Sequence, residues 1–152
     1  MRLTVYTDYS LRVLMYLAVN NGGLATIAGI AGAYGISKAH LTKVAHQLGL
    51  AGYVATVRGK GGGLRLARPA GEIGLGDVIR RTEPDMTLVP CFGPVNGTCP
   101  IVPACSLRGA LHQAHTAFMM VLDRYTLADL VQKRAELGGL LHAAQSAAPR
   151  PL

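Results

Sequence analysis

Acidic residues and cysteine are scarce in this chain, and long apolar runs are missing. Its 152 residues include eight Asp and Glu against fifteen Lys and Arg, which leaves a net charge of +7. No window approaches 18 uninterrupted apolar residues, so we expect no membrane span. Asp8 and Arg12 fall where a signal peptide would be apolar. Reduced cysteines without a signal peptide indicate a cytoplasmic protein.

Sequence motifs of common enzyme classes are also absent. The chain lacks Cys-x-x-Cys, and no acidic pair lies beside its cysteines, which argues against a thiol redox enzyme. The run Gly61-Gly62-Gly63 is not followed by Lys-Ser or Lys-Thr, which argues against a nucleotide-binding P-loop. We therefore expect no enzyme. A cysteine-dependent redox enzyme stays as an alternative, which turnover of a dithiol substrate would reveal.

A proline-rich loop, residues 84–105, holds all three cysteines. Cys91, Cys99 and Cys105 are spaced Cys-x7-Cys-x5-Cys, and five of the eight prolines lie in the same segment. Because proline fixes φ and removes backbone donors, the loop can be neither a regular helix nor a central strand. Asp85 is its only charged residue. A rigid, uncharged loop with three thiols suits a thiolate-bound metal centre.

Three alternatives account for these cysteines. An odd number excludes a complete intramolecular disulfide framework. Buried structural thiols explain poorly why all three lie within fifteen residues. A zinc site needs a fourth ligand, which His112 or His115 could supply, but the usual pair of Cys-x2-Cys knuckles is absent. An iron–sulfur cluster is therefore the preferred interpretation.

The positive charge is concentrated in the first part of the chain. Residues 1–70 hold eight basic side chains and one acidic side chain, whereas residues 71–152 hold seven of each. The whole excess of +7 therefore lies before residue 71. Such asymmetry indicates a polyanion-binding module joined to a neutral partner.

The same first part predicts a helix-turn-helix with a β-hairpin wing. Capping residues and apolar spacing predict three helices. The first is capped by Thr7 and Asp8 and ends near Asn20. The second spans Ala25–Tyr34, and the third spans Lys38–Leu50. Alternating β-branched residues predict strands over 52–57 and 64–66, joined by a basic glycine-rich turn. The third helix and the wing would contact DNA, through Ser37, Lys38, His40, Thr42, Lys43, Arg58 and Lys60.

The second part predicts a short helix, Leu75–Thr82, and then a long helix capped by Ser106 that ends near Tyr125. Apolar residues in the long helix alternate four and three positions apart, the period of a two-helix coiled coil, at Leu107, Leu111, Ala114, Phe118, Val121 and Tyr125. We therefore expect a homodimer. Thr126 would cap a further short helix, residues 127–137, before a disordered tail.

The expected fold is mainly α with a small β-hairpin wing, a winged helix-turn-helix followed by a long C-terminal dimerisation helix. Its expected divisions are a DNA-binding domain at 1–83, the cysteine loop at 84–105, the dimerisation helix with the following short helix at 106–142, and the tail at 143–152.

The stretches YTDYSLRVLMYLA, GYVATVRGKGGGLRL and FMMVLDRYTLADLV, together with the three cysteines, resemble the NsrR-type nitric-oxide-sensing repressors, in the same superfamily as the IscR iron–sulfur regulators. The resemblance covers residues 1–135. It implies a homodimeric repressor that binds a double-stranded DNA operator. Nitric oxide would act as the signal, and loss or nitrosylation of a 4Fe-4S cluster in the dimer interface would release the operator.

The resemblance also implies the ligands of the cluster. Three are Cys91, Cys99 and Cys105. The IscR-like pattern places a histidine three residues after the third cysteine, where this chain has Arg108, whereas the NsrR-like pattern takes an aspartate from the partner subunit, here Asp8. A plain helix cap is the other interpretation of this aspartate. A 2Fe-2S regulator that senses redox or cluster status, and a zinc-stabilised winged-helix protein, stay as alternatives.

Overall fold

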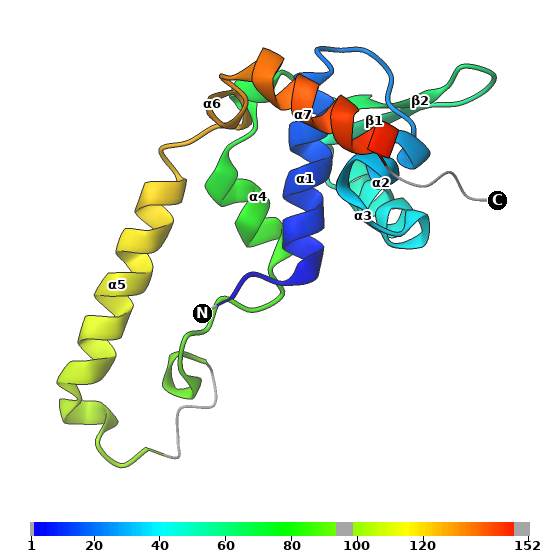
Figure 1. Ribbon diagram of the computed structural model, residues 1–152. Helices are drawn as coiled ribbons and strands as arrows, with labels where there is room; N and C mark the ends of the chain where they lie inside the picture. The colour runs from blue at the N-terminus through cyan, green and yellow to red at the C-terminus, as the bar shows by residue number, and fades with distance from the viewer. Residues whose placement is uncertain (1, 94–98, 148–152) are drawn as a thin grey trace.

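The computed structural model describes residues 2–93 and 99–147 (Figure 1). A compact group of helices carries a projecting two-stranded hairpin on one side and a long helical arm on the other. The elements confirm a mainly helical winged-helix fold: α1 Val5–Val19, α2 Ile27–Tyr34, α3 Lys38–Leu50, β1 Val54–Val57, β2 Gly63–Leu66, α4 Leu75–Thr82, α5 Ser106–Leu122, α6 Leu127–Leu130 and α7 Arg134–Ala147.

Helix α1 runs through the middle of the compact part and supplies most of its core. It contacts α3, α4, α6, α7 and β2, and Leu14 and Leu17 on it are 0% and 1% exposed. Around them pack the apolar faces of the other elements, including Ile30, Leu41 and Val78. A helix surrounded in this way can pass a shift at its first turn to the elements packed around it.

The beginning of α1 differs from the sequence prediction. The cap is Thr4, whose hydroxyl accepts a hydrogen bond of 3.2 Å from the Thr7 backbone N–H. Thr7 is fully buried in the first turn, and Asp8 also lies within that turn. The interpretation of Asp8 as a helix cap is therefore wrong, because a threonine one turn earlier satisfies the free N–H groups.

Helices α2 and α3 form the predicted helix-turn-helix. Gly35 ends α2 with a left-handed φ of +63°, which glycine adopts without steric cost, and its N–H donates to the Ala31 carbonyl. Ser37 then caps α3, which spans the predicted residues. Helix α2 begins two residues later than predicted, because Ala25 is instead bridged to Leu64 at the edge of the hairpin.

Strands β1 and β2 are antiparallel, with Val54 opposite Leu66 and Val57 opposite Gly63. Val54 and Leu64 are buried against the helices. Their burial fixes the register, because a slip of either strand by one residue would turn its own buried side chain to solvent. The hairpin projects from the compact part as a wing (Figure 1).

The long arm is α5, and it follows the cysteine loop. Its cap is Cys105 rather than the predicted Ser106, since the Cys105 sulfur accepts the Arg108 backbone N–H. The helix ends at Leu122, three residues before the predicted end. Helix α4 is its main contact among the described elements, so most of the arm stands clear of the rest of the molecule (Figure 1).

The chain after Thr126 differs most from its prediction. Thr126 and Asp129 form a capping box, but α6 lasts only to Leu130, and a second helix, α7, follows. Residues 143–147, expected in a disordered tail, continue α7, which packs across α2. Residues 148–152 lie outside the described residues. Among the helices that the structure describes, none has the length and apolar character that a membrane span requires.

Candidate functional site

The predicted DNA-contacting residues lie on α3 and on the turn of the wing. Lys38, His40, Thr42 and Lys43 are all exposed on α3. Their opposite face is buried in the core through Leu41, Val44, Ala45 and Leu48. Amphipathic α3 therefore presents a polar, basic face to solvent while its apolar face is held rigidly.

The N-terminal end of α3 is ordered by two local hydrogen bonds. The Ser37 hydroxyl accepts the His40 backbone N–H at 3.3 Å, and the Thr42 hydroxyl donates to the Lys38 carbonyl at 2.8 Å. Arg58 and Lys60 are exposed in the turn between β1 and β2. Helix α3 and the wing thus present two separate basic surfaces of the kind that binds phosphate groups.

The three cysteines are free, and the structure places them unequally. Cys91 lies in a single 3-10 turn, Pro90–Phe92, and Cys105 caps α5, and both are half-buried. Cys99 is exposed. The segment 94–98 between the first two cysteines lies outside the described residues, and within the described part no three His, Cys, Asp or Glu side chains gather as metal ligands.

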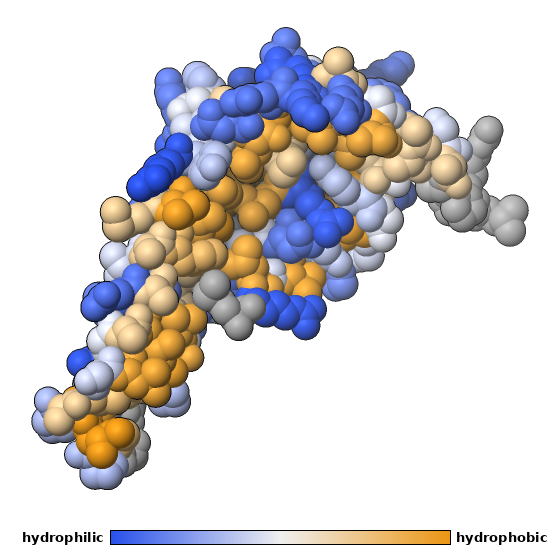
Figure 2. All heavy atoms as spheres, turned by 60° about the vertical axis from the view of Figure 1, so that its left-hand side comes forward, coloured by the Kyte–Doolittle hydropathy of each residue, from blue (hydrophilic) through white to orange (hydrophobic). Residues whose placement is uncertain are grey.

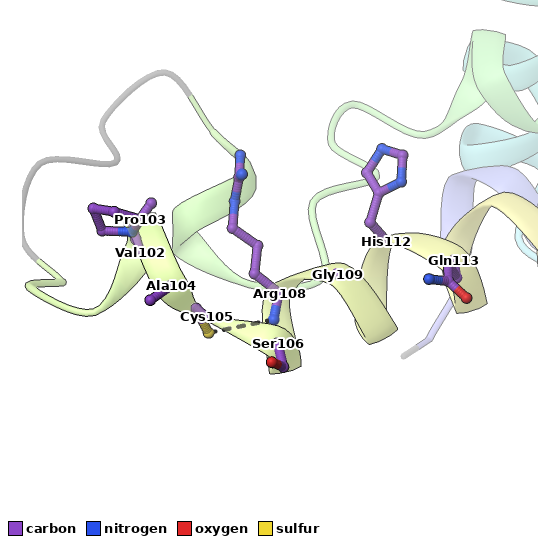
Figure 3. Close-up of a pocket in the computed structure, with 9 residues that line it drawn as sticks. All are labelled: Val102, Pro103, Ala104, Cys105, Ser106, Arg108, Gly109, His112 and Gln113. Atoms are coloured by element: carbon purple, nitrogen blue, oxygen red, sulfur yellow. Dashed lines mark hydrogen bonds between the residues drawn. The ribbon is translucent and has the colours of Figure 1, made fainter.

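Arg108 connects two of the three cysteine positions in the loop. Its backbone N–H donates to the Cys105 sulfur at 3.4 Å, and its side-chain Nε donates to the Cys91 carbonyl at 3.3 Å. Figure 3 shows the Arg108 side chain extending from α5 toward the loop, at a hollow of about 650 Å³. Arginine has no lone pair to offer a metal, and its two hydrogen bonds make Arg108 a residue that orients the loop.

The two histidines considered as zinc ligands have other surroundings. His112 lines the same hollow as Cys105 (Figure 3), and its ring meets Phe92 edge-to-face with centroids 5.9 Å apart. His115 points to a different hollow beside Phe118, where its Nε2 is buried without a hydrogen-bond partner among the described residues. Neither histidine joins a metal-ligand group in the described part of the chain.

Asp8 pairs with Arg12 one turn later on α1. Their closest atoms, Oδ2 of Asp8 and Nε of Arg12, are 2.9 Å apart, and both side chains are close to half exposed. The Arg12 guanidinium also lies over the Tyr34 ring, 5.7 Å from its centroid. Burial raises the pKa of Tyr34, although the nearby Arg12 charge opposes that rise. The carboxylate is therefore connected through Arg12 to the last residue of α2.

Glu83 contacts the Thr4 cap of α1, a contact that was not predicted from the sequence. Its Oε1 accepts the Thr4 backbone N–H at 2.7 Å and the Thr4 hydroxyl at 3.2 Å. Glu83, the residue after α4 and just before the cysteine loop, therefore holds the cap of the helix that carries Asp8. The two are 79 positions apart in sequence, and no local pattern indicates such a pairing.

Comparisons with known proteins agree with this arrangement. Residues 3–133 match the family model Rrf2, described as an iron-dependent transcriptional regulator. The HTH-type transcriptional regulators NsrR of Geobacillus kaustophilus and of Bacillus subtilis are each 49% identical over 142 residues, which are 93% of this chain and 97% of theirs.

Solved structures show the same fold. CymR, the global cysteine regulator of B. subtilis, superposes with a TM-score of 0.73 and 27% identity over 88% of this chain and 98% of its own. IscR of T. potens superposes with a TM-score of 0.68 and 25% identity over 88% of each chain. The chain therefore belongs to the Rrf2 family and is a DNA-binding winged-helix repressor.

Proposed function

We propose that this repressor senses nitric oxide through a 4Fe-4S cluster. Cys91, Cys99, Cys105 and the partner subunit's Asp8 would be the cluster ligands. The observation that carries the proposal is the set of three free thiols on the segment that joins the winged domain to the arm. Regulators named NsrR at 49% identity support it further.

The donor set fits an iron–sulfur cluster better than zinc. Thiolates are the usual ligands of such clusters, and the chain lacks the pair of Cys-x2-Cys knuckles that is usual for structural zinc. Cys105 already accepts a backbone N–H at the start of α5, and hydrogen bonds to sulfur are among the features that tune a cluster. When bound, the cluster supplies iron that reacts with nitric oxide.

Asp8 would pass the state of that site to the DNA-binding helices. In the structure its carboxylate is engaged by Arg12. Ligation in the partner subunit would compete with this ion pair, because both use the same carboxylate oxygens. Arg12 faces Tyr34 at the end of α2, so a change of partner at Asp8 alters contacts three residues before Ser37, which caps α3.

A second contact connects α1 directly to α3. The Tyr9 ring lies beside the His40 ring, with centroids 6.3 Å apart. Tyr9 follows Asp8 in the chain, and His40 is a predicted DNA contact. Half-sites of a dimeric helix-turn-helix protein are spaced by one helical turn, about 34 Å. A small rotation of α1 in each subunit would therefore move both recognition helices out of register.

Anaerobic purification of single variants tests the proposal. Cys91→Ala, Cys99→Ala and Cys105→Ala should each lose iron and specific operator binding while the protein stays dimeric. His112→Ala is the matched control, because it alters the same hollow without removing a thiol, and it should keep both. A colourless wild-type protein that contains zinc, or full iron content in any cysteine variant, would contradict the assigned ligands.

Asp8→Ala tests the connection between the subunits. This variant should keep a cluster on three thiolates but bind the operator less tightly, and a hundredfold weakening corresponds to about 2.7 kcal/mol. Cluster absorbance and operator binding should be followed together while nitric oxide is added. Wild-type operator affinity together with a wild-type response to nitric oxide would show that Asp8 only forms the ion pair with Arg12.

A further inference from the structure

Three arginines that have no role above line one hollow at the base of the wing. Arg65 lies on β2, Arg68 follows that strand, and Arg134 is the first residue of α7. The hollow measures about 460 Å³, and the end of α1 together with Asn21 forms part of its wall. No Asp or Glu is found among the described residues that line it. The fold thus gathers three positive charges that the sequence separates.

Two of these guanidinium groups are held by partners that carry no charge. Nη1 of Arg134 donates a 2.7 Å hydrogen bond to the side-chain oxygen of Asn21. The Arg68 guanidinium lies over the Tyr53 ring, 4.7 Å from its centroid. An amide oxygen and an aromatic face orient an arginine without cancelling its charge. Both guanidinium groups are therefore held in place, while no carboxylate in the described part of the chain compensates their positive charge.

Two other arginines of the chain are neutralised by carboxylates. Arg12 pairs with Asp8 at 2.9 Å, and Arg80 pairs with Asp123 at 2.5 Å. By contrast, the three arginines of the hollow form no ion pair within residues 2–93 and 99–147. Like charges gathered in a hollow create a positive local potential, and an anion bound there would relieve their repulsion.

We propose that Arg65, Arg68 and Arg134 form a phosphate-binding site. Guanidinium groups match phosphate oxygens in a bidentate geometry, and three of them suit the several oxygens of a phosphate group better than the two of a carboxylate. The phosphate could belong to the DNA backbone, because β2 is a strand of the wing, or to a free phosphorylated molecule. The proposal is independent of the cluster and of nitric-oxide sensing.

Binding to a duplex of random sequence tests the first source. Arg65→Gln, Arg68→Gln and Arg134→Gln should each weaken binding and reduce the slope of log affinity against log salt by about one unit. Arg134→Lys should recover most of the slope, because it keeps the charge. Arg124→Gln is the matched control, since it removes the same charge from an exposed turn after α5, and it should leave the slope unchanged.

Inorganic phosphate tests the second source. At constant ionic strength, replacing chloride by phosphate should raise the thermal midpoint of the wild-type protein and of Arg124→Gln. The double variant Arg65→Gln/Arg68→Gln should lose that rise. A phosphate effect without a change in DNA slope identifies a free phosphorylated ligand, and a DNA slope change identifies the backbone. If all variants match Arg124→Gln in both experiments, the proposal is overturned.

Discussion

Lys43 on α3 and Lys60 in the wing represent the two parts of the predicted DNA-contacting surface. Both are exposed, and α3 is fixed to the core through the opposite face. Lys43→Ala should weaken operator binding, because it removes a contact expected in the major groove. Lys60→Ala should reduce the salt dependence by about one unit of slope, as expected for a lost phosphate contact. Unchanged affinity and slope in both variants would place the DNA elsewhere.

The carboxylate of Asp129 makes the stability of the protein depend on pH. It accepts hydrogen bonds of 2.7 Å from both the backbone N–H and the hydroxyl of Thr126, and these bonds lower its pKa. A lowered pKa means that the stabilisation is complete above the unfolded value of about 3.9 and is lost as the pH falls through the folded value. Asp129→Asn keeps an acceptor but removes the charge.

Thermal midpoints measured from pH 7 down to pH 2 check this assignment. The difference between the wild-type protein and Asp129→Asn should be constant at neutral pH and should shrink below about pH 4. The same series of midpoints for Asp85→Asn is a suitable comparison, because hydrogen bonds from Thr87 likewise lower the pKa of Asp85 in an exposed loop. A difference that stays the same across the whole range would mean that the charge of Asp129 contributes nothing.

At the scale of elements, the wing depends on a close backbone approach at Gly63. A Cβ added at Gly63 would lie 2.7 Å from the Ala25 carbonyl oxygen, which accepts the Leu64 N–H at 2.7 Å. Gly63→Ala should therefore push β2 away from Ala25 and destabilise the fold by about 1–3 kcal/mol. Gly71→Ala is the matched control, since nothing lies within 4 Å of its added Cβ.

Urea denaturation of both variants measures the effect. Gly71→Ala should be neutral or slightly stabilising, because alanine restricts the unfolded chain more than glycine. Gly63→Ala should also weaken non-specific DNA binding if the hairpin no longer holds its tip in place. Equal midpoints for the two glycine variants would show that the strand can shift without cost.

The elements also show which features a sequence can predict. Helix α3 was predicted at both ends, because Gly35, Ser37 and the apolar face are all local signals. The start of α1 was not, since Thr4 and Thr7 are both plausible caps and the choice depends on Glu83, which follows α4 far along the chain.

The same limit applies to the C-terminal helices and to the candidate site. Helix α7 is held by Gln145, whose amide donates to the Tyr16 hydroxyl and the Gly29 carbonyl, and no neighbouring residue indicates these partners. Cysteine spacing predicts a metal site in the loop, but local sequence could not show that Arg108 ties Cys91 to Cys105.

At the scale of the whole molecule, a single chain leaves an apolar surface on the α5 arm exposed to solvent. Leu107, Val121 and Tyr125 are 66%, 49% and 46% exposed on the arm and the turn after it, and Figure 2 shows hydrophobic surface running along this region. They belong to the predicted coiled-coil face, whose Leu111 and Phe118 are half-buried. From exposed apolar side chains at this spacing we expect a second copy of α5 to pack here.

Charged substitutions on this face should separate the subunits. Leu107→Asp combined with Val121→Asp would place carboxylates in the expected seam, where burial without a partner is costly. Sedimentation should then show a monomer, while circular dichroism keeps the helical signal, because the core residues of α1 and α3 lie elsewhere. The monomer should lose operator binding, since a single recognition helix cannot occupy two half-sites.

Met120→Asp is the matched control for the dimer. Met120 is 54% exposed on the same helix, but it lies about 100° around the axis from Val121 and outside the 3.5-residue seam. It should therefore leave the dimer intact while it changes hydropathy and charge in the same way. A dimer that survives the double substitution, or dissociates equally with Met120→Asp, would mean that α5 does not pair through this face. The proposed ligation by the partner subunit's Asp8 would then need another interface.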